Sequence, residues 1–144
     1  RATEPYLDQT ALADETIPKL LPKTAAAIGR AAYRLALDLD AAAIVATTSS
    51  GSTARLVSRF RPPCPVAGLT ANLETQRQLS LSWGIIPIKI ETFEDTDQMF
   101  DKASSWVLKQ QLAKPGDMLV ITAGVPLGVK GTTNLVKAME LKEN

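Results

Sequence analysis

The sequence predicts one α/β domain, in which a mostly parallel sheet is covered by helices on both faces. Short apolar runs alternate with helical patterns along the chain, which indicates β-α-β units with right-handed crossovers. The runs at residues 43–46 and 118–122 are apolar almost throughout. Strands that are buried on both faces of a sheet have this character. The length of 144 residues is that of one domain, and 45% hydrophobic residues are enough for its core.

The domain is expected to cover residues 23–144, after a polar lead-in segment at residues 1–22. Three prolines break any long helix in the lead-in segment. The first helix is expected from about residue 23 to residue 39, because its apolar residues recur at the spacing of one helical face. Since the sequence begins with arginine rather than methionine, we expect a fragment or a processed chain.

The remaining elements alternate in type along the chain. The expected strands cover residues 43–46, 66–70, 85–90, 118–122 and 134–141. The expected helices between them cover residues 53–60, 73–83 and 95–112. Asp95 or Thr96 can cap the start of the longest of these helices. Since no helix separates the last two strands, the last strand should run antiparallel to the one before it.

Composition excludes several classes of function. The chain has 16 basic and 15 acidic residues, which gives a net charge of +1. This balance argues against nucleic acid as the main partner, because binding to its phosphates needs clustered positive charge. The lack of histidine excludes a Ser-His-Asp triad, a Cys-His pair and a His-ligated metal within this sequence. No pair of carboxylates stands out as an acid-base couple, so we expect neither catalytic residues nor a metal site.

Cysteine content and hydropathy bear on the compartment. Cys64 is the one cysteine and cannot form an internal disulfide, which favours a reducing compartment such as the cytoplasm. No apolar run approaches the roughly 20 residues that a membrane-spanning helix needs. We therefore expect no membrane partner.

A run of hydroxyl side chains follows the first expected strand. Six of the seven residues from 47 to 53 are serine or threonine, and the seventh is Gly51. The run joins a strand to a helix, at the place where open α/β sheets bind ligands. A helix N-terminus offers free N–H groups and partial positive charge, so phosphate is a natural ligand there. The candidate phosphate-binding residues are Thr48, Ser49, Ser50, Gly51, Ser52 and Thr53.

The same run has a simpler interpretation, in which a serine or threonine caps the helix and the remainder is a polar loop. The residues by themselves leave both interpretations open. Arg55 and Arg59 follow on the same helix, with Arg61 just beyond it. These three arginines are interpreted as a solvated face rather than as an anion patch.

A glycine-rich segment at residues 124–131 is the second candidate ligand loop, with Lys130, Gly131 and Thr132 as its candidate residues. It resembles a P-loop but lacks the spacing, because three residues rather than four separate its first two glycines. In a P-loop the lysine is followed directly by serine or threonine. Here Gly131 separates Lys130 from Thr132. A strand rather than a helix is expected to follow. A flexible β-connection therefore explains this segment at least as well as a ligand loop does.

Four segments together carry a family resemblance. The most specific are residues 48–62, which begin Thr-Ser-Ser-Gly-Ser-Thr, and residues 131–134, Gly-Thr-Thr-Asn. The run at 67–75 and the Trp-Gly pair at 83–84 belong to the same pattern. In this order the segments resemble the C-terminal domain of the pyruvate kinase family, over about residues 23–141.

The resemblance implies a particular fold. It is a three-layer α/β/α domain with a five-stranded mixed sheet in the order 3-2-1-4-5, with strand 5 antiparallel. This order puts the switch point between strands 1 and 4, so both candidate loops would flank one crevice. The family's effector-phosphate loop falls on residues 48–53, which favours phosphate binding over simple capping.

The resemblance also implies a parent enzyme, a pyruvate kinase that transfers phosphate from phosphoenolpyruvate to ADP in glycolysis. Its catalytic residues, Mg²⁺ and K⁺ would lie in a separate barrel domain, so this sequence alone is expected to be inactive. The domain itself would bind a phosphorylated small-molecule effector and take part in assembly. We expect a homo-oligomer, a dimer for this chain alone and a tetramer for the parent enzyme.

Two departures from the family pattern concern a second phosphate. Members that hold fructose 1,6-bisphosphate tightly have tryptophan and arginine where Thr92 and Met99 stand here. Some animal members have lysine in place of Ser49. We therefore expect a monophosphate to bind better than a bisphosphate. Two alternatives remain, a stand-alone domain that binds a phosphorylated metabolite and an assembly module with a vestigial site.

Overall fold

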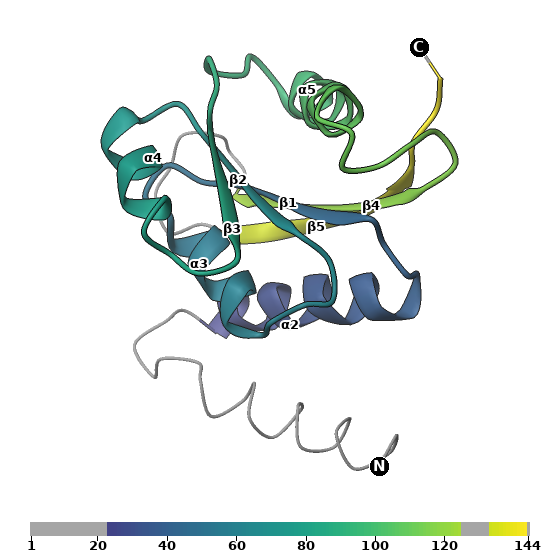
Figure 1. Cartoon of the computed structure of the whole chain (residues 1–144). Helices are drawn as coiled ribbons and strands as arrows, with labels where there is room; N and C mark the ends of the chain where they lie inside the picture. Colours follow the sequence, from purple (N-terminus) through teal and green to yellow (C-terminus); the bar gives the residue numbers. More distant parts are fainter. Residues whose placement is uncertain (1–22, 125–132, 144) are drawn as a thin grey trace.

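The computed structural model describes residues 23–124 and 133–143, and it contains a twisted mixed sheet (Figure 1). Within these residues the sheet has five strands in the order β3-β2-β1-β4-β5. The strands are β1 (Ala43–Thr47), β2 (Val66–Thr70), β3 (Ile85–Lys89), β4 (Met118–Gly124) and β5 (Thr133–Glu140). β1 pairs in parallel with β2 and β4, and β2 pairs in parallel with β3, whereas β5 runs antiparallel to β4. The predicted strand order and the reversed last strand are confirmed.

Helices cover both faces of the sheet. Those in the described residues are α2 (Lys23–Asp38), α3 (Ser52–Arg59), α4 (Leu73–Leu79) and α5 (Thr96–Lys109). Figure 1 shows α5 on one face and α2 and α3 on the other. α4 lies on the α3 side, because its Leu79 is buried with Ala54 of α3 and Ile85 of β3. The three-layer α/β/α arrangement is therefore confirmed.

The position of the central strand β1 between two helix layers explains why its sequence is apolar. Val45 packs with Met99 of α5 in the core of one face. Ile44, the residue before Val45, packs with Ala36 of α2 and Val57 of α3 in the core of the other face. Successive side chains of a strand point to opposite faces, so a strand between two helix layers must bury both sets. All five residues of β1 are buried.

α4 ends earlier than the sequence predicted, at Leu79 rather than residue 83. The chain tightens beyond Leu79, because the N–H groups of Leu81 and Ser82 bond to carbonyl groups three residues back. Such bonds belong to the last turn of a helix and end the regular pattern. Trp83 follows outside the helix and is 74% exposed, so it is not a core residue.

α5 begins as predicted and ends early. Asp95 is its N-cap, and the Asp95 carboxylate accepts a hydrogen bond of 2.8 Å from the Gln98 N–H group. The helix ends at Lys109, and Gln111 has a φ of 59°. A residue in the left-handed region cannot continue an α-helix. In the part of the chain that the structure describes, no helix has both the length and the apolar character needed to cross a membrane.

Candidate functional site

A pocket of about 520 Å³ lies at the end of the sheet where the parallel strands finish. Each strand contributes a residue at or next to its end: Thr47 from β1, Thr70 from β2, Ile90 beyond β3, Gly124 from β4 and Thr133 from β5. Because β5 runs the other way, it contributes its first residue rather than its last. The pocket therefore occupies the crevice at the carboxyl ends of the parallel strands, where open α/β sheets bind ligands.

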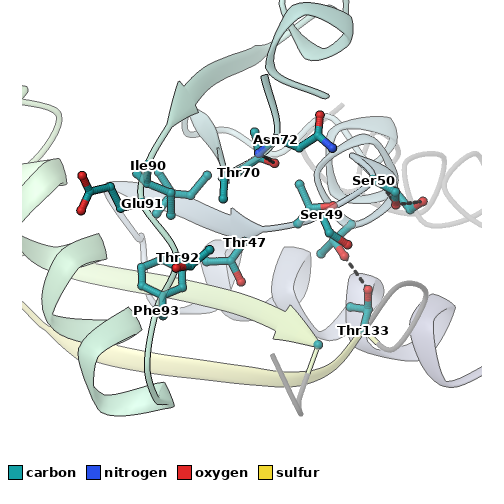
Figure 2. A pocket seen from close by; sticks show the side chains of 16 residues that line it. Thr47, Ser49, Ser50, Thr70, Asn72, Ile90, Glu91, Thr92, Phe93 and Thr133 are labelled. Carbon is teal, nitrogen blue, oxygen red and sulfur yellow. Dashed lines mark hydrogen bonds between the residues drawn. The ribbon is translucent and has the colours of Figure 1, made fainter. Parts of the chain in front are cut away.

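Residues 48–53, which we call the hydroxyl loop, form one wall of this pocket (Figure 2). All five of its hydroxyl residues that the sequence singled out line the cavity, namely Thr48, Ser49, Ser50, Ser52 and Thr53. Gly51, the sixth candidate residue, is buried within the loop and is the N-cap of α3. It has a φ of 90°, in the left-handed region that favours glycine. The structure therefore brings the whole candidate set together at one helix start.

The simple capping interpretation is wrong for this helix. Gly51 rather than a serine or threonine occupies the N-cap position, and no side chain makes the N-cap hydrogen bond. The loop hydroxyls bond to one another and to loop N–H groups instead. The Gly51 N–H group donates to Thr48 Oγ1 at 2.8 Å, and the Ser50 and Ser52 hydroxyls lie 2.9 Å apart. Their position around the start of α3 suits an anion that accepts several hydrogen bonds.

One strand and one helix anchor the hydroxyl loop. The Thr48 N–H group donates to the carbonyl of Leu69 in β2 at 2.9 Å. The Thr75 hydroxyl of α4 donates to the Ser49 carbonyl at 2.8 Å. Thr75 is an anchor that the sequence analysis did not identify as one, since it lies 26 positions from its partner. The loop is thus held on its β2 and α4 side by two bonds to backbone groups.

Thr53 is joined to the start of β5. Its hydroxyl lies 2.5 Å from the Thr133 hydroxyl, and both residues are buried. In Figure 2 a dashed line marks the hydrogen bond at Thr133. Thr133 belongs to the site, although the sequence prediction chose the three residues before it. Those candidates, Lys130, Gly131 and Thr132, lie outside the described residues.

The opposite wall is formed by residues between β3 and α5. Thr92 points toward Thr47, whereas the Glu91 carboxylate points away from the hydroxyl loop (Figure 2). Among the described residues that line the pocket, Glu91 is the one charged residue. Met99 does not line the pocket. It is fully buried behind it, where its sulfur accepts a hydrogen bond from the Thr47 hydroxyl at 3.3 Å.

Cys64 is remote from this chemistry. Burial raises the pKa of its thiol to about 11, and the charge of Asp40 adds to the rise. The thiol is therefore protonated at neutral pH and is a poor nucleophile. Among the described residues, no group of three or more Cys, Asp or Glu side chains is placed to hold a metal ion.

The fold and the pocket together define an open α/β domain with a cavity lined by hydroxyl residues at its topological switch point. The family model described as "Pyruvate kinase, alpha/beta domain" matches residues 26–139. The pyruvate kinase of Staphylococcus saprophyticus is 45% identical over 111 residues, which are 77% of this chain and 19% of that protein. That of Geobacillus stearothermophilus is 43% identical over the same shares of the two chains.

A solved structure gives the same result. Pyruvate kinase of Cryptosporidium parvum in complex with ADP matches with a TM-score of 0.79 and 26% identity, over 93% of this chain and 27% of that chain. The chain therefore belongs to the family of pyruvate kinase α/β domains, as its sequence pattern indicated. It spans about a fifth of the length of the first two relatives.

Proposed function

We propose that this chain is the regulatory and assembly domain of a pyruvate kinase, and that its hydroxyl loop binds the phosphate group of a small effector. The observation that carries the proposal is the pocket at the strand ends, which the hydroxyl loop lines beside a helix start without a side-chain cap. The parent enzyme transfers phosphate from phosphoenolpyruvate to ADP in glycolysis, in the cytoplasm. Its Mg²⁺ and K⁺ are assigned to a barrel domain, and this chain alone is inactive.

The phosphate is held by hydroxyl and N–H donors. The hydroxyls of Thr48, Ser50 and Thr53 donate to it, together with backbone N–H groups from Gly51 to Thr53. On binding, the Gly51 N–H group exchanges its present acceptor, Thr48 Oγ1, for a phosphate oxygen. Thr133 then donates to Thr53, which leaves the Thr53 proton for the ligand. Hydrogen bonds to a charged group contribute about 1.5–3 kcal/mol each.

The charge of the pocket favours one phosphate rather than two. No lysine or arginine is present among the described residues that line it, and Thr92 on the far wall is neutral. A second phosphate would have no cationic partner among these residues, where the one charged side chain, Glu91, is itself negative. Lys130 is the basic residue nearest in sequence to the end of β4. A single lysine binds phosphate less well than an arginine, whose planar guanidinium group can donate two parallel hydrogen bonds.

Calorimetry tests the phosphate site and its preference. Glucose 6-phosphate, ribose 5-phosphate, AMP and fructose 1,6-bisphosphate are titrated into the wild type, Thr53→Ala and Thr53→Ser. We expect at least one monophosphate to bind best, Thr53→Ala to weaken it about tenfold and Thr53→Ser to retain affinity, because serine keeps the hydroxyl. A bisphosphate that binds tenfold tighter than every monophosphate overturns the preference. Absence of binding by all four ligands overturns the effector site.

A further inference from the structure

Arg55 packs against the hydroxyl loop from outside the pocket. It does not line the cavity, and its Nη2 atom donates to the Ser50 carbonyl at 3.1 Å. A Cβ atom built on Gly51 would lie 2.6 Å from Arg55 Nη1. The guanidinium group therefore fills the space that a side chain at position 51 would need. This contact differs from the solvated face that the sequence suggested, since Arg55 is half-buried while Arg59 is exposed.

The peptide unit between Ser50 and Gly51 is held at both of its polar ends. Its carbonyl accepts from Arg55, and its N–H group donates to Thr48 Oγ1 at 2.8 Å. The C=O and N–H groups of a trans peptide point in opposite directions. Thr48 lines the pocket and Arg55 does not, so the N–H end of this peptide lies on the side of a pocket residue and its carbonyl end on the side of Arg55.

Arg55 also brings positive charge to a loop that lacks it. The pocket lining contains no lysine or arginine among the described residues. A charged donor on the carbonyl polarises the whole peptide unit and strengthens the N–H group at its other end as a donor. A half-buried charge is screened by salt less than an exposed one.

We propose that Arg55 is a positioning residue for phosphate, which it serves through the Ser50–Gly51 peptide and without contact to the ligand. This inference rests on the proposed phosphate site. It assigns the affinity of that site in part to a side chain outside the pocket. Lysine at position 55 keeps the positive charge but lacks the planar guanidinium group that covers Gly51. We therefore expect it to retain only part of the wild-type affinity.

The test compares Arg55→Gln, Arg55→Lys and Arg59→Gln, the last as a matched control one helical turn away. Affinity for glucose 6-phosphate and for inorganic phosphate is measured by calorimetry. We expect Arg55→Gln to weaken both about tenfold or more, Arg55→Lys to be intermediate and Arg59→Gln to stay within twofold of the wild type. If Arg55→Gln binds as tightly as Arg59→Gln, Arg55 has no positioning role.

A second measurement separates positioning from loss of the fold. Amide hydrogen exchange is followed by NMR in the free protein, with Gly51 as the reporter and Val45 of β1 as the core reference. Arg55→Gln should speed exchange at Gly51 and leave Val45 unchanged. Equal acceleration at both amides would mean general destabilisation and would overturn the proposal. If the wild type binds none of the four phosphorylated ligands titrated above and no inorganic phosphate, the phosphate site itself is wrong, which is a different result from variants that bind like the wild type.

Discussion

Gly51 is under two constraints at once. Its φ of 90° is unfavourable for any residue with a Cβ atom, and Arg55 occupies the space where that atom would lie. Gly116 has a similar φ of 95° but no atom within 4 Å of its Cβ position. The two glycines therefore separate the cost of the backbone conformation from the cost of displacing the guanidinium group.

Alanine substitutions measure this difference. Gly116→Ala should lower the free energy of unfolding by about 1–2 kcal/mol, from the left-handed conformation alone. Gly51→Ala should lower it further, because Arg55 must also move, and should weaken phosphate binding. Urea unfolding monitored by circular dichroism gives both values. Equal losses in the two variants would show that Arg55 moves aside at no cost.

Cys64 supplies a prediction for alkaline pH. Burial raises the pKa of its thiol from 9.0 to about 11, so the folded state holds the proton more tightly than the unfolded state. The resulting stability is complete below pH 9 and is lost as the pH rises toward 11. Alkylation of the native protein by iodoacetamide should accordingly have its midpoint near pH 11. A midpoint near pH 9 would show that the thiol is solvated.

At the scale of elements, α5 covers its face of the sheet chiefly through a few buried side chains. Met99, Ala103 and Val107 are fully buried against the strands. Met99→Ala should cost about 2–5 kcal/mol, because it leaves a cavity behind β1 and removes the sulfur that accepts from Thr47. Met99→Leu keeps the volume and should cost less than about 1.5 kcal/mol. Thermal unfolding checks the order, and a larger loss in Met99→Leu would contradict it.

The sequence predicted these elements well where periodicity is strong. Apolar strands such as β1 and amphipathic helices follow from local pattern, and all the strands of the described sheet lie close to their predicted positions. The early end of α4 did not follow, because Leu81 and Trp83 continue an apolar pattern that the structure leaves exposed. Local pattern cannot distinguish a buried apolar residue from an exposed one when no partner is known.

The site was predicted unevenly for the same reason. The hydroxyl loop is a contiguous run, so its composition was enough to find it. The Thr53–Thr133 pair spans 80 positions, so local pattern does not reveal it. Composition also did not indicate that Gly51, rather than one of the serines and threonines around it, is the N-cap. Arg55 looked like a surface residue, because its acceptor is a backbone carbonyl that carries no sequence signal.

At the scale of the molecule, we expect self-association through β5. This strand lies at an edge of the sheet and is paired in the described structure on its β4 side. Unpaired N–H and C=O groups at an edge favour pairing with a second copy. Light scattering at high micromolar concentration should give a dimer. A strict monomer would count against this interface.

A control distinguishes β5 from a second exposed surface. Leu81 and Trp83 are 89% and 74% exposed, near the opposite edge strand β3. The double variant Leu81→Ser, Trp83→Ser should remain a dimer if β5 is the interface. Dissociation of that variant into monomers would move the interface to the β3 side.

The reversal of β5 also bears on how much the connection before it can vary. Gly124 and Thr133 are register partners, so the sheet itself fixes the two ends of the segment 125–132 side by side. The pocket wall that these two residues form is therefore independent of how many residues join them. Doubling the length of a flexible connection costs only about 0.6 kcal/mol in closure entropy. Insertions and deletions between Gly124 and Thr133 can therefore accumulate without moving the two residues that line the pocket from this side.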